Sequence, residues 1–386
     1  MDRIDKIFDS FTSNSLFRNK VVLQSNYSPQ IILHRAEQIE NLASILGPAL
    51  NGDRVSNIFL YGKTGTGKTL SARFLAEKMQ NKANEAGNIK LRFLYINCKS
   101  KKISDTEYRI IAELIKSMGE TIPSTGLPTD VVYSKFIDMI DKEKQNIILI
   151  LDEIDQAVKK ISDNFIYTLT RMNSELKNAQ ISIIGISNSL TFMDNLDPRV
   201  RSSLGEEEII FPPYNALQLR DILKERADTA FVSDCLEEGV IAKCAAYAAR
   251  EHGDARRALD LLRVAGEIAV REGSKMINIQ HIDAANSKIE RDKMLDIIES
   301  EPAQFQLVLY AIMELDNTKG EELIYTGDVF NTYEEICKKT KNEALTQRRI
   351  SDILAEFDML GIINARVISK GRQGRTREIK LMLSPT

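Results

Sequence analysis

Residues 62–69 have the sequence Gly62-Lys63-Thr64-Gly65-Thr66-Gly67-Lys68-Thr69, and this stretch decides the fold. It fits the pattern G-x-x-x-x-G-K-[ST]. It follows a short apolar run, Asn57–Tyr61, and precedes a segment, Leu70–Met79, with apolar residues at helical spacing. We therefore expect a buried strand, a glycine-rich loop and a helix whose N-terminus gives phosphate groups N–H donors and positive potential. The alternative is an ordinary Gly-Thr turn between a strand and a helix.

Each residue type in this loop suits a nucleoside triphosphate. The glycines let the backbone turn tightly and approach phosphate oxygens. Lys68 would reach the β and γ phosphates, and Thr69 would offer its hydroxyl to Mg²⁺. We expect nucleotide contacts from Gly62, Lys63, Thr64, Gly65, Thr66, Gly67, Lys68, Thr69 and Leu70.

A second apolar run, residues 146–151, ends abruptly in Asp152, Glu153 and, after Ile154, Asp155. A continuous apolar run is typical of a strand buried on both faces, and open α/β sheets bind ligands at the carboxyl ends of their strands. Asp152 is therefore expected to hold Mg²⁺, and Glu153 to orient and deprotonate the attacking water. The alternative is a solvated helix start that carries three acids.

Two further segments bring candidate polar groups to the site. A strand expected at Ile181–Ile186 is followed by Asn188, which could position the attacking water or could simply cap a turn or helix. Asp254 looks like the N-cap of a helix with Arg256 in its first turn, where a cation is unfavourable to the helix dipole. Arg256 could contact a nucleotide phosphate or pair with a nearby acid.

Two arginines, Arg199 and Arg201, follow a proline-marked turn at Pro198. Either could complete the site of a neighbouring subunit in trans. Either could equally form a surface salt bridge.

The composition indicates a multidomain soluble protein. With 386 residues, 43% of them hydrophobic, the chain can bury two or three cores. The charged N-terminus is unlike a signal peptide, no apolar run approaches the roughly 18 residues of a membrane span, and we expect a cytoplasmic, nucleoid-associated protein without a membrane partner. The cysteines are too far apart for a zinc knuckle, namely Cys98, Cys235, Cys244 and Cys337.

The order of expected elements divides the chain into three parts. Strands alternate with helices up to about residue 206, which predicts an α/β domain with a parallel sheet over 1–206. After Phe211-Pro212-Pro213-Tyr214-Asn215, residues 207–293 form an expected all-α lid. Residues 294–386 carry three helical patterns and then two strands, which predicts a winged helix-turn-helix.

This last part carries the features of a DNA-binding domain. Between Lys338 and Lys380 there are eleven Lys and Arg against five Asp and Glu, a net charge of +6. The third helix begins after Thr346, its expected N-cap, and we expect only its first turn to contact DNA, since Asp352 and Glu356 share its outer face. The expected DNA contacts are Gln347, Arg348 and Arg349 on the helix and Lys370, Gly371, Arg372, Gln373, Gly374 and Arg375 at the hairpin tip. The alternative is a solvated basic hairpin on a protein-interaction domain.

Taken together, these motifs resemble the AAA+ ATPases, and nearly the whole chain is similar to the archaeal Orc/Cdc replication-initiator family. The resemblance rests on GKTGTGKT, ILILDEID, Asn188 and the GDAR helix start, and more specifically on His34-Arg35 with Gln38-Ile39, Ile96-Asn97-Cys98 leading to Tyr108-Arg109-Ile110-Ile111, Gly126-Leu127-Pro128, and the run from Glu251 to Asp260.

The resemblance implies roles for residues that the motifs alone leave open. It implies that Asn188 is sensor 1, that Arg256 is sensor 2, and that Arg199 matches a trans finger better than Arg201 does. Arg35 and Tyr27 correspond to the region lining the adenine pocket, and we also expect Tyr214 at the nucleotide. The segment from Glu120 to Pro128 matches an initiator-specific insertion that packs against DNA, with its tip at Thr121, Ile122, Pro123, Ser124, Thr125 and Gly126.

The implied function is that of an ATP/ADP-switched, Mg²⁺-dependent, slow ATPase. It would bind double-stranded origin DNA through both its winged and its AAA+ domains, act with other initiator paralogues, and recruit the replicative helicase. One alternative is a winged AAA+ DNA motor of the branch-migration type, although no aromatic-plus-glycine pore loop is evident between Leu91 and Lys144. Another is an ATP-sensing transcription regulator, against which Glu153 argues.

Overall fold

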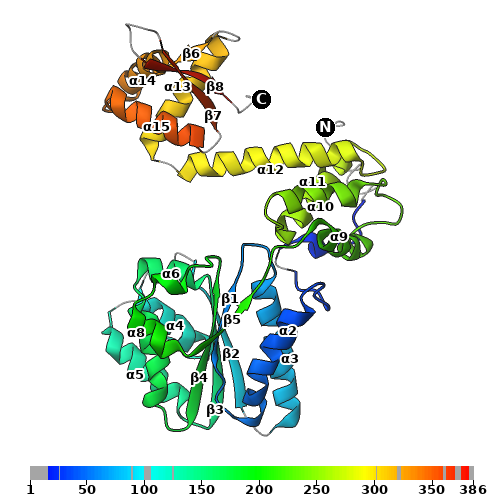
Figure 1. The fold of residues 1–386 in the computed structure, drawn as a ribbon, viewed down its shortest axis with the longest axis vertical. Helices are drawn as coiled ribbons and strands as arrows, with labels where there is room; N and C mark the ends of the chain where they lie inside the picture. The colour runs from blue at the N-terminus through cyan, green and yellow to red at the C-terminus, as the bar shows by residue number, and fades with distance from the viewer. Residues whose placement is uncertain are drawn as a thin grey trace, which may run out of the picture. The chain divides into compact units, whose positions relative to one another are not determined.

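The computed structural model describes residues 16–25, 27–87, 90–99, 106–123, 126–300, 302–319, 323–359, 362–369 and 375–381. The chain divides into two compact units, Met1–Ile282 and Asp283–Thr386. Figure 1 shows the first unit as a layered α/β domain joined to a group of helices.

The first unit contains a five-stranded parallel sheet in the order β2-β3-β4-β1-β5. The strands are β1 (Asn57–Tyr61), β2 (Lys90–Asn97), β3 (Gln145–Asp152), β4 (Ala179–Ser187) and β5 (Glu206–Ile210). Tyr61 is level with Ser187, and Asn97 is level with Asp152, so the carboxyl ends of neighbouring strands meet along one edge. The predicted parallel sheet is confirmed.

Helices cover both faces of this sheet. Successive residues of a strand point to opposite faces, and since both sets are apolar here, both faces must be covered. Phe59 of β1 packs into the core on one face, and its neighbours Ile58 and Leu60 pack into the core on the other. The first face carries α4 (Glu107–Ser117), α5 (Thr129–Ile140), α6 (Ile154–Lys160), α7 (Asn164–Arg171) and α8 (Pro198–Leu204), and the second carries α2 (Ala36–Leu46) and α3 (Lys68–Ala86) (Figure 1). Short 3₁₀ turns are η1 (Lys20–Leu23), η2 (Gly47–Asn51), η3 (Met172–Ser174) and η4 (Met193–Asn195).

The strand β5 was not predicted. The sequence prediction places the end of the sheet domain at residue 206, but the sheet continues to Ile210, where β5 pairs with β1. Three glutamates in succession, Glu206 to Glu208, hide the apolar pattern of a strand. Charged side chains on an edge strand discourage pairing with another chain, which accounts for acids in this position.

The helices after the sheet form the expected lid: α9 (Ala216–Ala230), α10 (Val240–Arg250), α11 (Ala255–Arg271) and the start of α12 (Ile279–Ser300). An N-terminal segment packs on this lid, which the sequence did not predict. Its backbone N–H groups at Arg18 and Asn19 donate to the carbonyl oxygen of Ala230, and Phe17 stacks on Phe231 with ring centroids 4.8 Å apart. The lid therefore combines a chain segment that precedes the sheet domain in the sequence with the helices that follow it.

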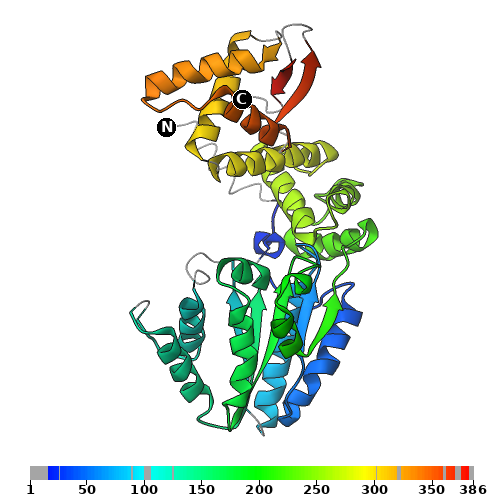
Figure 2. The ribbon, with the colours of Figure 1, turned by 60° about the vertical axis from the view of Figure 1, so that its left-hand side comes forward.

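The second unit confirms the predicted winged-helix elements. It contains α13 (Ala303–Lys319), α14 (Thr326–Thr340) and α15 (Gln347–Met359), followed by the antiparallel strands β7 (Ile363–Ser369) and β8 (Arg375–Leu381), drawn in red in Figure 2. A two-residue strand that was not predicted, β6 (Ile324–Tyr325), pairs with β8. The backbone N–H of Arg349 donates to the Thr346 hydroxyl, which confirms Thr346 as the cap of α15.

Among the residues that the structure describes, no helix has the length and apolar character needed to span a membrane.

Candidate functional site

The glycine-rich loop joins β1 to α3, as predicted, and α3 begins directly after Gly67, whose φ is 93°. Lys68 is buried, and its ammonium donates to three oxygens: the carbonyls of Gly62 at 2.6 Å and Lys63 at 2.7 Å, and Asn188 Oδ1 at 2.9 Å. Burial lowers the pKa of Lys68 to about 8, although Asp152 and other carboxylates oppose that shift. The structure therefore places the predicted lysine and the predicted sensor asparagine side by side.

The predicted magnesium residues also meet. The Thr69 hydroxyl donates to Asp152 Oδ2 at 2.9 Å, and the Tyr95 hydroxyl donates to the same oxygen at 2.8 Å. A hydroxyl and a carboxylate suit Mg²⁺, which takes one or two protein oxygens together with substrate phosphates. No group of three or more His, Cys, Asp or Glu that could hold a metal occurs in the described part of the chain. The donor set fits an ion held largely by a nucleotide.

Glu153 follows Asp152 and adopts a left-handed backbone conformation, with φ of 54° and ψ of 44°. This conformation costs a residue with a side chain about 1–2 kcal/mol, and strain of this kind gathers at functional sites. At this residue the chain leaves β3 and enters α6, and the side chain of Glu153 lines the same cavity as Lys68. The position fits the predicted water-activating role.

The lid contacts the loop directly. Asp254 caps α11 by accepting from the N–H groups of Arg256 at 2.7 Å and Arg257 at 3.2 Å, as predicted. The N–H of Ala255 donates to the carbonyl oxygen of Gly65 at 3.2 Å. Gly65 has φ of +69°, and a Cβ there would lie 1.7 Å from Asp254 Oδ1, so only glycine allows this approach.

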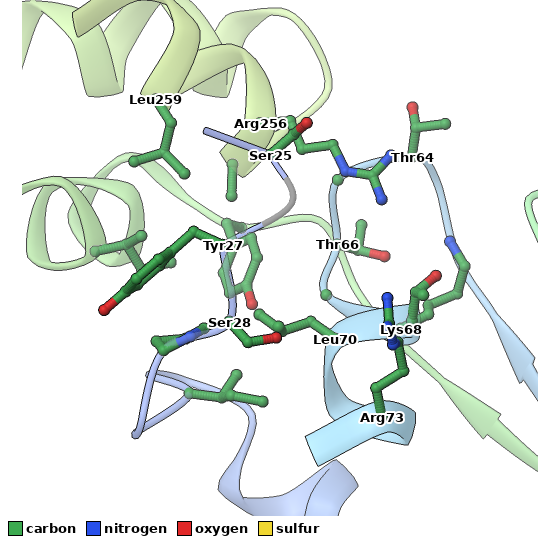
Figure 3. A pocket seen from close by; sticks show the side chains of 18 of the residues that line it. Ser25, Tyr27, Ser28, Thr64, Thr66, Lys68, Leu70, Arg73, Arg256 and Leu259 are labelled. Atoms are coloured by element: carbon green, nitrogen blue, oxygen red, sulfur yellow. The ribbon is translucent and has the colours of Figure 1, made fainter. Parts of the chain in front are cut away.

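Arg256 is brought to the site by this contact. Figure 3 shows its side chain extending from the lid toward Thr64 and Thr66. Its positive charge also contributes to the lowered pKa of Lys68. Two cations that line one cavity create a strong preference for an anionic ligand in it.

These groups surround one cavity of about 310 Å³. The predicted residues among its lining are Tyr27, Thr64, Gly65, Thr66, Gly67, Lys68, Thr69, Leu70, Asp152, Glu153, Asn188, Tyr214 and Arg256. Figure 3 shows Tyr27, Ser28 and Leu259 on one side of the cavity and Thr64, Lys68 and Arg73 on the other. The cavity thus has one side formed by the glycine-rich loop and the cationic side chains of α3, and another side with an aromatic ring and an apolar side chain.

Arg35 differs from its prediction, since it does not line the cavity. It is only 2% exposed, and it donates to the carbonyl oxygens of Thr66 at 2.8 Å, His34 at 3.1 Å and Pro212 at 2.5 Å. Its guanidinium also lies 3.8 Å from the centre of the Tyr214 ring. Arg35 therefore ties the back of the loop to the chain that leads into the lid.

The arginine pair lies outside the cavity, and both residues belong to α8. Arg199 is exposed and pairs with Asp197 at 3.1 Å. Arg201 is also exposed and lies 3.6 Å from Asp194. Within this chain both arginines form the surface ion pairs that were the alternative to a role in trans.

The predicted DNA contacts are exposed where the structure describes them. In the insertion, Thr121, Pro123 and Gly126 are exposed while Ile122 packs against the core, and Ser124 and Thr125 lie outside the described residues. Gln347, Arg348 and Arg349 are exposed on the first turn of α15, and Arg349 lies 3.8 Å from Asp352. Lys370, Gly371, Arg372, Gln373 and Gly374 lie outside the described residues, and Arg375 begins β8.

The lining residues that the sequence prediction missed include four with polar or charged side chains that bear on the site: Arg73, Tyr95, Glu225 and Arg226. Tyr95 had a detectable signal, because it directly precedes Ile96-Asn97-Cys98, which the resemblance singles out, and its strand β2 pairs with the strand that ends in Asp152. Arg73 lies one turn after Thr69 on the same helix. Glu225 and Arg226 had no signal, since a charged pair on a lid helix resembles a solvated surface.

Three family models match separate parts of the chain: an AAA domain over residues 53–193, the Cdc6 AAA+ ATPase-type lid domain over 220–287, and the CDC6 C-terminal winged helix domain over 296–386. An ORC1-type DNA replication protein of Pyrococcus abyssi is 52% identical over 99% of this chain and 91% of its own length. ORC1-type DNA replication protein 1 of Methanosarcina mazei is 48% identical over 98% of this chain and 91% of its own length.

A solved structure gives the same result. The Aeropyrum pernix ORC1 protein in complex with DNA has a TM-score of 0.79 and 42% identity, and the match covers 95% of this chain and 94% of that one. The Pyrobaculum aerophilum Cdc6p structure shares the fold, with 23% identity and a TM-score of 0.63 over 94% of each chain. With an AAA+ sheet domain, a Cdc6-type lid and a winged helix joined in one chain, this protein belongs to the family of ORC1-type DNA replication proteins.

Proposed function

We propose that the chain binds Mg-ATP and Mg-ADP in the cavity between the sheet edge and the lid, and that it hydrolyses ATP slowly. The observation that supports this most is the placement of Lys68, Asn188 and Asp152 around one space that Arg256 also lines. Lys68 and Arg256 bind the phosphates, and Thr69 with Asp152 holds the magnesium ion. The ion stabilises charge that develops on the phosphates during transfer.

Hydrolysis needs a water in line with the γ phosphate. Glu153 lines the cavity and is the base that orients this water and accepts its proton. Asn188 is held against the Lys68 ammonium at 2.9 Å, a position from which its amide can also orient the water. The trans role of Arg199 stays open, because its side chain is exposed and able to meet a neighbouring molecule.

The protein acts on double-stranded origin DNA. Contacts come from the first turn of α15 with Gln347, Arg348 and Arg349, from the hairpin tip 370–375, and from the insertion tip 121–126. The DNA complex of the related Aeropyrum pernix ORC1 protein supports this proposal. The proposed domains are 1–206, 207–293 and 294–386, although the sheet itself extends to Ile210.

Nucleotide state controls DNA binding in this proposal. The lid contacts the loop through Ala255 and Asp254, so a γ phosphate drawn to Arg256 favours one lid position, and its loss favours another. The lid leads into the winged domain, so this shift changes how the two DNA-contacting domains meet one duplex. The DNA-competent state then recruits the replicative helicase with other initiator proteins.

Footprinting the purified protein on DNA of its own genome, first with ATP and then with ADP, tests the proposal. We expect protection of a few defined duplex sites, with a pattern that changes between the two nucleotides. Equal protection of random duplexes, unaffected by either nucleotide, would show that the proposal is wrong.

A further inference from the structure

Arg226 is a buried arginine whose donors are not satisfied. It lies on the lid helix α9, its side chain is 6% exposed, and its Nε and Nη1 atoms have no hydrogen-bond partner. The nearest carboxylate oxygen, on Glu225, is 3.5 Å from Nε but makes no hydrogen bond. Burial lowers the pKa of this guanidinium from its ordinary value. Leaving buried charged donors without acceptors destabilises a fold, so such a group calls for a functional reason.

Arg226 lines the candidate nucleotide cavity on the side away from the phosphate loop. Its guanidinium lies over the ring of Tyr27, 4.7 Å from the ring centre. Tyr27 is on the N-terminal segment that Arg18 and Asn19 tie to Ala230, one turn further along α9. Hydrogen bonds between the N-terminal segment and α9 therefore hold Tyr27 and Arg226 next to each other. The pair forms a wall of the cavity together with apolar side chains, among them Ile222 and Leu259.

This wall matches a nucleobase in shape and chemistry. Once Lys68 and Arg256 hold the phosphates, the base must occupy the remaining side of the cavity. An aromatic and aliphatic wall favours a flat ring, and the guanidinium can only donate hydrogen bonds. Adenine offers ring nitrogens that can only accept them, such as N7 and N3.

We propose that Arg226 is the base-recognition residue of this site, and that it donates to a ring nitrogen of adenine while Tyr27 holds its guanidinium in place. The inference rests on the proposed nucleotide binding and adds how the base is read. Nε and Nη1 are covered in the unliganded protein, so in this proposal the guanidinium turns toward the cavity as the base enters, and the base then supplies the acceptor that Arg226 lacks. Binding would then relieve a cost carried by the lid, and so favour the lid position in which α9 contacts the base.

The test compares ADP with inorganic tripolyphosphate, measured by calorimetry on the full chain and on Arg226→Met. Methionine keeps much of the side-chain volume and removes the unsatisfied donors, so the midpoint of thermal unfolding of the unliganded variant should stay equal or rise. The dissociation constant for ADP should increase roughly 10- to 100-fold, as expected for a lost charged hydrogen bond. Tripolyphosphate affinity should stay within a factor of about two, because Lys68 and Arg256 are intact.

Analogues of ADP identify the acceptor atom. The 1-deaza, 3-deaza and 7-deaza forms each replace one ring nitrogen by a carbon, and one of them should bind the unmodified chain about as weakly as ADP binds Arg226→Met. The affinity of that analogue for Arg226→Met should equal its affinity for the unmodified chain.

Three results would overturn the inference. One is an Arg226→Met protein that unfolds at a lower temperature yet binds ADP normally, which indicates a purely structural arginine. The others are equal losses for ADP and tripolyphosphate, and full affinity for all three deaza analogues. If the unmodified chain binds no ADP, or if Lys68→Ala binds it unchanged, then the proposed nucleotide site itself is wrong.

Discussion

The two sides of the cavity are built in opposite ways. On the phosphate side the buried arginine, Arg35, donates to three carbonyl oxygens and holds the loop closed against the sheet domain. On the opposite side the buried arginine, Arg226, has two nitrogens without a hydrogen-bond acceptor, with the ring of Tyr27 against it and a carboxylate oxygen of Glu225 at 3.5 Å from Nε. A satisfied arginine stabilises the fold, whereas an unsatisfied one costs stability that a ligand can restore. The phosphate side is thus preformed, and the other side is completed by what binds there.

The first prediction removes the chemistry and keeps the phosphate side otherwise intact. Glu153→Gln should lower the rate of ATP hydrolysis by roughly 10²- to 10⁴-fold, the usual contribution of a general base. Affinity for ATP should change little, since the amide keeps the size of the side chain and no phosphate contact is lost. Phosphate release under single-turnover conditions, with calorimetry for ATP, checks both parts. A variant that hydrolyses ATP at the unmodified rate would remove Glu153 from the mechanism.

The second prediction tests how closely the lid approaches the loop. Gly65→Ala forces a methyl group onto Asp254, in addition to the strain of φ +69°. Gly87→Ala is the matched control, because Gly87 has φ of +64° and nothing within 4 Å of an added Cβ. Both variants should lose about 1–2 kcal/mol of stability from strain, and Gly65→Ala about 1–3 kcal/mol more from the clash.

Thermal unfolding and ADP affinity together separate these two effects. We expect Gly87→Ala to bind ADP normally and Gly65→Ala to bind it at least 10-fold more weakly. Equal behaviour of the two variants would mean that the lid does not rest on the loop in solution.

The third prediction compares the two buried arginines directly. Arg35→Met should lower stability by about 1–3 kcal/mol, because the substitution leaves carbonyl oxygens of Thr66 and Pro212 without a donor. Arg226→Met should not lower it. Thermal unfolding of the two unliganded variants, measured side by side, should therefore give shifts of different sign or clearly different size. Similar losses in both would end the distinction between the two sides.

The fourth prediction concerns protons and has the smallest effect. With its pKa lowered to about 8 from an ordinary value of 10.5, Lys68 is largely uncharged at pH 9 in the folded protein. Bound phosphate favours the ammonium, so ADP binding at pH 9 should take up as much as one proton, and none at pH 6.5. The unfolded chain also binds this proton more tightly than the folded chain does. The contribution of Lys68 to the free energy of unfolding therefore rises between about pH 8 and 10.5.

Calorimetry in two buffers of different ionisation enthalpy measures the proton uptake. The observed enthalpy should depend on the buffer at pH 9 and be independent of it at pH 6.5. Buffer-independent enthalpies at both values would show that Lys68 keeps its proton.

Sequence motifs predicted the residues on the phosphate side of the cavity, whereas on the other side only Tyr27 was predicted, by resemblance, and Arg226 was missed. The reason is distance along the chain. The loop and the acids that follow β3 are contiguous motifs whose chemistry is visible in their spacing. Arg226 and Tyr27 are about 200 positions apart and meet only because the N-terminal segment packs on the lid. Arg35 was assigned to the nucleotide pocket by resemblance, and the structure places it behind the loop instead.

The same reasoning applies to the folds of the two units. The helices and hairpin of the winged unit follow clear periodic patterns, and the structure has the three helices and two final strands that were predicted. The strands β5 and β6 were missed, since one is masked by glutamates and the other has only two residues. Tertiary pairing, with β1 and with β8, is what makes these segments strands.

Calorimetric binding of Mg-ADP to the unmodified chain and to Lys68→Ala tests the central claim most directly. Lys68 joins the loop carbonyls to Asn188, and its positive charge lines the same cavity as that of Arg256. We predict saturable binding of one nucleotide per chain, weakened at least 100-fold in the variant. Equal affinity in the two proteins would contradict the account.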